Sequence, residues 1–75
     1  MTLQEALFEL HRQKPDAVLS DGTTDWAPGP LLQALQQMRD PDLDRPVQVS
    51  ERGIWFLSPD GSQDSAVAYE FKENG

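Results

Sequence analysis

The sequence contains no cysteine and only one histidine among its 75 residues. Without thiols, neither a disulfide nor a thiolate metal site can add to the stability of the fold. The absence of cysteine fits a protein that resides in a reducing compartment. His11 has no serine, cysteine or second histidine in a pattern typical of a nucleophilic or metal site. We therefore expect a protein that is not an enzyme and that holds no cofactor.

Long apolar segments are also missing. No apolar run approaches the roughly 18 residues that a membrane-spanning helix requires. The N-terminus has neither the basic residues nor the apolar stretch of a signal peptide. We expect a soluble, cytoplasmic chain without membrane contact. Its length suits one small domain over residues 1–75.

Positive charge is scarce, because six basic residues face thirteen acidic ones and the net charge is −7. This balance opposes direct binding to nucleic acid, since lysine and arginine must replace the counterions of the phosphates. The acids are scattered except over residues 40–44, which is typical of a solvated surface. The alternative is an acidic surface that imitates nucleic acid and inhibits a basic partner.

Two segments have the periodicity of amphipathic helices. Leucine and alanine recur at helical spacing over residues 3–13, where Thr2 and Glu5 form a capping-box pattern. The second helix is expected over residues 30–39, with Pro30 at its first position. Phe8 lies off the leucine stripe of the first helix, so either a neighbouring loop covers it or it is exposed.

The connection between these helices is rich in turn residues. Residues 17–19 are short and apolar, and they form either an extra edge strand or an extended segment packed on the core. Trp26 follows in a loop that two prolines restrict. Its side chain either plugs the end of the core or belongs to a binding surface.

One run of four large apolar residues, 54–57, organises the second half of the chain. Its composition and the turn residues on both sides predict a strand over residues 53–58. Strands over 46–50 and 66–72 flank it, and the short turns between them predict a three-stranded antiparallel β-meander. Because side chains alternate along a strand, Trp55 and Leu57 share one face, and we expect the other face to pack on the helices.

The resulting fold class is α+β, with two amphipathic helices on one face of the meander. Such a sheet needs cover on its apolar face, and the helices are the cover that the sequence offers. The expected core consists of Leu3, Leu7, Leu10, Leu31, Leu35, Met38, Val47, Val49, Ile54, Phe56, Val67, Tyr69 and Phe71.

The acidic segment has the spacing of a calcium loop. Asp40, Asp42 and Asp44 occupy the first, third and fifth positions, and Glu51 occupies the twelfth, so residues 40–51 resemble an EF-hand loop. The resemblance implies calcium or another divalent cation as a ligand. The segment departs from the family at Arg45, where the family has glycine, and in the strand-like sequence that follows Glu51.

The function expected from this pattern is a non-enzymatic protein-protein interaction module or a homodimer. If the helices cover one face of the sheet, Trp55 and Leu57 form an apolar patch on the other. Trp26 and Phe8 are the next candidates for partner contact. Divalent-cation binding by residues 40–51 and imitation of nucleic acid are the alternatives, and the partner is another protein or a second copy.

Overall fold

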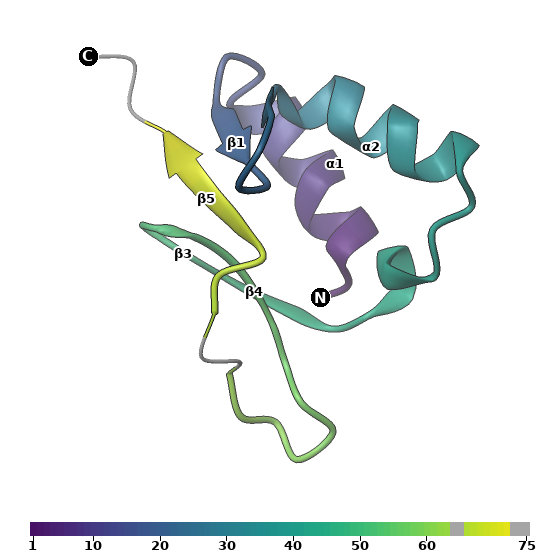
Figure 1. Cartoon of the computed structure of the whole chain (residues 1–75), viewed down its shortest axis with the longest axis vertical. Coiled ribbons are helices and arrows are strands. Elements are labelled where there is room, and N and C mark those ends of the chain that lie inside the picture. The colour runs from purple at the N-terminus through teal and green to yellow at the C-terminus, as the bar shows by residue number, and fades with distance from the viewer. Residues whose placement is uncertain (64–65, 73–75) are drawn as a thin grey trace.

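The computed structural model describes residues 1–63 and 66–72. Over these residues the chain forms two α-helices, one short 3₁₀ helix and a five-stranded antiparallel sheet (Figure 1). The elements in chain order are α1 (Leu3–Gln13), β1 (Val18–Ser20), β2 (Asp25–Trp26), α2 (Pro28–Gln37), η1 (Pro41–Asp44), β3 (Val47–Ser50), β4 (Gly53–Phe56) and β5 (Tyr69–Lys72).

The sheet has the strand order β2-β1-β5-β4-β3 over the described chain, so the predicted three-stranded meander is only its second half. A strand, β1, does form close to the predicted residues 17–19, at Val18–Ser20, but its predicted place at an edge is wrong. Leu19 pairs with Trp26 of β2 on one side and with Phe71 of β5 on the other. Local sequence does not reveal this arrangement, because the partners of β1 include a strand about fifty residues later.

The first helix has the predicted bounds, and its start is fixed by a complete capping box. The Thr2 hydroxyl accepts the N–H of Glu5 at 3.2 Å, and the Glu5 carboxylate accepts the N–H of Thr2 at 3.0 Å. Each bond satisfies a backbone donor that the first turn of a helix leaves free. The capping box therefore also holds the Glu5 carboxylate near the N-terminus of α1, which is the positive end of the helix dipole.

The second helix begins two residues before the predicted position. Pro28 is its first residue, and Ala27 is the N-cap. Pro30 still lies in the first turn, where a missing N–H costs no helical hydrogen bond. The helix ends at Gln37, and Arg39, two residues beyond it, has a φ of 53°. The N–H of Asp40 bonds to the carbonyl of Leu35.

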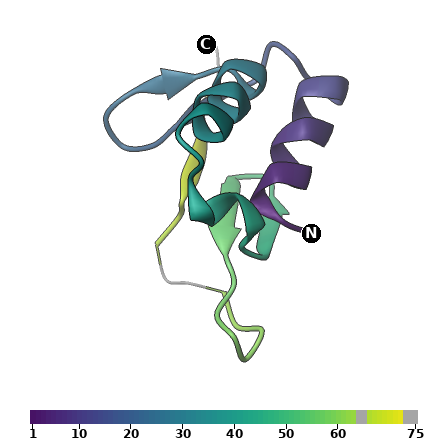
Figure 2. The ribbon, with the colours of Figure 1, turned by 90° about the vertical axis from the view of Figure 1, so that its right-hand side faces the viewer.

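The core joins both helices to one face of the sheet. Figure 2 looks onto the helices, with β5 passing behind α2. Leu3 and Leu7 of α1 and Ile54 of β4 are fully buried, and the described cluster of buried apolar residues is Leu3, Ala6, Leu7, Leu19, Leu31, Leu32, Leu35, Leu43, Val47 and Ile54. Leu10, Phe56, Tyr69 and Phe71 pack against it while partly exposed. The expected direction of Ile54 and Phe56 toward the helices is therefore confirmed.

Three residues were wrongly assigned to the core or to its face. Met38 is 66% exposed because it follows the last residue of α2, and Val49 is 42% exposed because β3 is the outer strand. Val67 precedes β5, which begins at Tyr69 rather than at residue 66. Its side chain lies beside Trp55, on the opposite face from Tyr69 and Phe71.

The N-terminus covers part of the outer edge of β3. Thr2 forms a bridge with Pro46, and the carbonyl of Met1 accepts the N–H of Val47 at 2.8 Å. A covered edge is protected from pairing with other chains.

No helix in the described part of the chain is long and apolar enough to cross a membrane.

Candidate interaction surface

The outer seam between α1 and α2 carries two adjoining hollows, of about 540 and 530 Å³. Phe8, Leu32 and Gln36 line both of them, and we call this surface the Phe8 groove. At one end it continues along Met1, Gln4, Glu5 and Glu9, and at the other along His11, Gly29, Pro30 and Gln33.

Phe8 is exposed because of its position on the helix. Leu3 and Leu7 point into the core, and the residue after Leu7 lies about 100° farther around the helix axis. Phe8 is consequently 55% exposed, whereas Leu32, which lines the same groove from α2, is only 8% exposed. An exposed aromatic ring and a buried leucine thus line the same groove at the seam of the two helices.

The two helices approach closely near His11. A methyl group placed on Gly29 would lie 2.7 Å from the imidazole Nδ1 of His11, which is shorter than real contacts of this kind. Glycine at this position therefore allows α2 to pack against the histidine. His11 serves as packing at one end of the groove.

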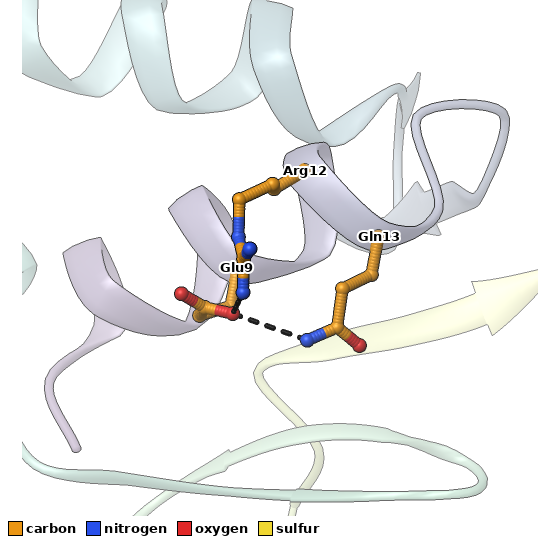
Figure 3. A network of polar contacts seen from close by, with 3 residues as sticks. All are labelled: Glu9, Arg12 and Gln13. Carbon is orange, nitrogen blue, oxygen red and sulfur yellow. Dashed lines mark hydrogen bonds and ion pairs between the residues drawn. The ribbon is translucent and has the colours of Figure 1, made fainter.

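The charged groups on the solvent side of α1 form a small network (Figure 3). Arg12 Nη2 donates to Glu9 Oε2 at 2.8 Å, and Gln13 Nε2 donates to the same oxygen at 3.1 Å. The hydrogen bond from Arg12 lowers the pKa of the Glu9 carboxyl. The backbone hydrogen bond from Thr2 likewise lowers the pKa of Glu5, so both carboxylates are charged at neutral pH.

The sheet face that points away from the helices carries the predicted Trp55 site. Trp55 is half-buried, and a hollow of about 250 Å³ lies between it, Arg52, Val67 and Glu70. Leu57 is also half-buried and forms a β-bridge with Gln63. This region is smaller and more polar at its rim than the Phe8 groove, and it lies on a different layer of the fold.

Trp26 lies at the other end of the sheet, beside a tightly bonded turn. Its ring N–H donates to Asp21 Oδ2 at 3.3 Å, and its side chain packs partly on the core. The second oxygen of Asp21 accepts the N–H groups of Thr23 and Thr24 at 2.9 and 2.8 Å. These bonds, with the backbone bond from Thr23 as the largest contribution, lower the pKa of Asp21 to about 2.

The 40–51 segment folds differently from a calcium loop. Asp40 Oδ1 accepts the N–H of Asp42 at 2.9 Å and caps η1, and Arg45 lies 3.6 Å from the Asp42 carboxylate. Asp44 ends η1, and Glu51 lies in the turn beyond β3. Within residues 1–63 and 66–72, no three histidine or acidic side chains are grouped so that they could hold a metal ion.

The four predicted contact residues are distributed over three parts of the molecule. Trp55 and Leu57 belong to the strand and turn on the far side of the sheet, Trp26 to β2, and Phe8 to α1. The contribution of α2 to the Phe8 groove was missed. The signal in the sequence was Leu32, which lies at the margin of the leucine stripe of α2, as Phe8 lies outside that of α1.

Comparison with models of known protein families finds no match, and comparisons with curated proteins and with solved structures find none either.

Proposed function

We propose that this protein is a non-enzymatic module that binds another protein chain through the Phe8 groove. The observation that carries the proposal is the 55% exposure of Phe8, which lines two adjoining hollows together with the buried Leu32. Large aromatic side chains in such positions are typical anchors of protein interfaces. Exposed apolar surface of this kind gains free energy when a partner excludes water from it.

The size of this gain sets what a partner must supply. A phenylalanine side chain carries roughly 150–250 Å² of surface, so covering its exposed half contributes about 2–3 kcal/mol. Association costs more than this in lost translational and rotational freedom. The partner must therefore also cover further surface, and Met1, which is 62% exposed at the end of the groove, is available for this contact.

The charged groups of the groove support binding rather than catalysis. Glu5 holds the start of α1, and Glu9 is bonded to Arg12 and Gln13. Both carboxylates have lowered pKa values, whereas a general acid or base near neutral pH needs a raised one. The module that we propose needs no cofactor and acts in the cytoplasm, without contact to membranes or direct contact to nucleic acid.

The Trp55 and Leu57 patch, expected from the sequence, is the second candidate for partner contact. Trp55 and Leu57 are each less exposed than Phe8, and Arg52 and Glu70 flank the hollow. Imitation of nucleic acid also stays a prediction, based on the net charge of −7. The bonds of Asp40 and Asp42 within η1 favour a structural role for the acidic segment over cation binding.

Site-specific photo-crosslinking tests the proposal. A photoreactive phenylalanine analogue replaces Phe8 in one variant and Met38 in a control, because both side chains are well exposed and Met38 lies outside the groove. We expect a defined adduct with one polypeptide from position 8 and none from position 38. Equal labelling from both positions, or a defined adduct only from a third variant modified at Trp55, would contradict the proposal.

A further inference from the structure

We infer that the partner which fits the Phe8 groove is a second copy of this chain, with the two α1 helices antiparallel about a two-fold axis near Phe8. This inference rests on the function proposed above and names its partner. In this arrangement each Phe8 ring enters the groove of the other copy. The evidence is the order of charges along the exposed side of α1.

The exposed side of α1 carries an acid, an aromatic ring and a cation in sequence. Glu5, Phe8 and Arg12 follow one another at steps of three and four residues, which places them on one side of a helix. This side is opposite the buried Leu3 and Leu7. The acid therefore lies toward the N-terminal end of the exposed stripe, and the cation toward the C-terminal end.

A stripe of this kind is complementary to itself when one copy is reversed. Glu5 lies about 4.5 Å before Phe8 along the helix axis, and Arg12 lies about 6 Å after it. A two-fold axis at Phe8 therefore brings Glu5 of each copy close to Arg12 of the other. The interface gains two opposite-charge pairs around a central pair of aromatic rings, as isologous contacts require.

The side chains involved are available for these contacts. Arg12 and Glu9 form an exposed pair, with side chains 64% and 40% exposed, and such pairs contribute little to stability. Arg12 has several donors, so it can keep Glu9 and contact a second carboxylate. Glu5 commits one oxygen, Oε1, to the capping box, which leaves the other available to Arg12 of the second copy.

The overall negative charge does not oppose this arrangement strongly. Only Glu5 and Glu9, two of the thirteen acidic residues, lie on α1. Charges farther apart than the Debye length of about 8 Å are largely screened at physiological salt. The net negative charge of the whole chain favours a basic partner. The α1 stripe contains Arg12 as well as Glu5, and it therefore favours the same stripe on a second copy.

A mixing experiment with two charge-reversal variants tests the inference. In a dimer of Glu5→Arg, both charge pairs between the copies become arginine opposite arginine. In a dimer of Arg12→Glu, both become glutamate opposite glutamate. In a heterodimer of the two variants, however, both pairs are again of opposite charge. Sedimentation velocity of each variant alone and of the equimolar mixture measures the association, and circular dichroism checks that each variant is folded.

We expect the wild-type chain to dimerise, each variant to associate at least about tenfold more weakly, and the mixture to regain the wild-type affinity. Phe8→Ser should be monomeric, and Lys72→Glu, which changes the same amount of charge on β5, should dimerise like the wild type. Association of either variant alone at wild-type strength, or a monomeric mixture of folded variants, would overturn the inference. If the wild type is monomeric and crosslinks from residue 8 to a different protein, the inference that the partner is a second copy is overturned, but the proposed function is not.

Discussion

Gly53 shows how a single residue permits the central strand pairing. It lies at the start of β4 opposite Glu70 of β5, with a φ of 158°. A Cβ at this position would overlap the carbonyl oxygen of Tyr69, and it would lie 3.0 Å from a methyl group of Val67. The backbones of β4 and β5 can approach here because residue 53 has no side chain.

Gly53→Ala should therefore lower the free energy of unfolding by about 2–4 kcal/mol, through backbone strain and the forced separation of β4 from β5. Urea unfolding measures the loss. Gly61→Ala is the control, because Gly61 also has a positive φ, of 87°. Within the described part of the chain, no atom beyond the residues next to Gly61 lies within 4 Å of an added Cβ. The control should lose only about 1–2 kcal/mol. An equal loss in both variants would mean that the contact with Tyr69 is unimportant.

Asp21 makes the stability of its turn depend on pH. The folded chain lowers its pKa from 3.8 to about 2, mainly through the backbone N–H groups of Thr23 and Thr24. A lowered pKa in the folded state means that the unfolded chain binds this proton more tightly. The stabilisation is complete above a pH of about 4, and it is lost as the pH falls toward 2.

NMR titration of the side-chain carboxyl of Asp21 should give a pKa of about 2. Asp21→Asn should flatten the decline of stability between pH 4 and 2, because this variant has no proton to bind there. Asp25→Asn removes the same charge from β2 and is the control for the loss of one negative charge. A carboxyl that titrates near 3.8 would show that the bonds to the turn do not persist in solution.

At the scale of elements, the sequence predicts what local chemistry decides. The bounds of α1 follow from the Thr2 cap and the leucine spacing, and β3 and β4 follow from their alternation and short turn. The position of β1 in the sheet depends on pairing with β5, so no local pattern contains it. The start of α2 was misplaced because two nearby prolines, Pro28 and Pro30, are both compatible with a first helical turn.

The β1 strand should contribute to global stability, because it lies inside the sheet. Leu19 is fully buried between β2 and β5, so Leu19→Ala should cost about 2–5 kcal/mol. Val18→Ala is the matched control, since Val18 is only half-buried. Its side chain points to the opposite face of the strand from that of Leu19. Chemical denaturation monitored by tryptophan fluorescence gives both values. A loss below about 1 kcal/mol for Leu19→Ala would place β1 outside the cooperative core.

The η1 segment should not bind calcium at micromolar concentrations. Its Asp40 carboxylate caps the backbone, Arg45 lies beside Asp42, and Glu51 is separated from them by β3. Isothermal titration calorimetry should therefore give no saturable heat of binding for the wild-type chain. Saturable binding that Asp40→Ala abolishes would instead support the cation-binding alternative, and the 40–51 segment would have to rearrange to supply its ligands.

At the scale of the whole molecule, the described residues form two candidate surfaces on different layers, the Phe8 groove on the helices and the Trp55 region on the sheet. The sequence predicted a contact surface on the far face of the sheet, and that contact stays a prediction. The sequence also identified Phe8 as a residue outside the helical stripe. It did not anticipate that α2 would place Leu32 and Gln36 beside Phe8 and form a groove. That groove depends on the packing of two helices, which the separate sequence patterns of α1 and α2 do not contain.

Isotope-filtered NMR measures the central claim most directly. A mixture of ¹³C-labelled and unlabelled chain reports only contacts between different copies. We expect cross-peaks from the Phe8 ring of one copy to Phe8 and Leu32 of the other, and their loss in Phe8→Ser with the fold retained. Cross-peaks that arise from Trp55 and Leu57 instead, or none at concentrations at which the chain is dimeric, would contradict the assignment of the Phe8 groove as the contact surface.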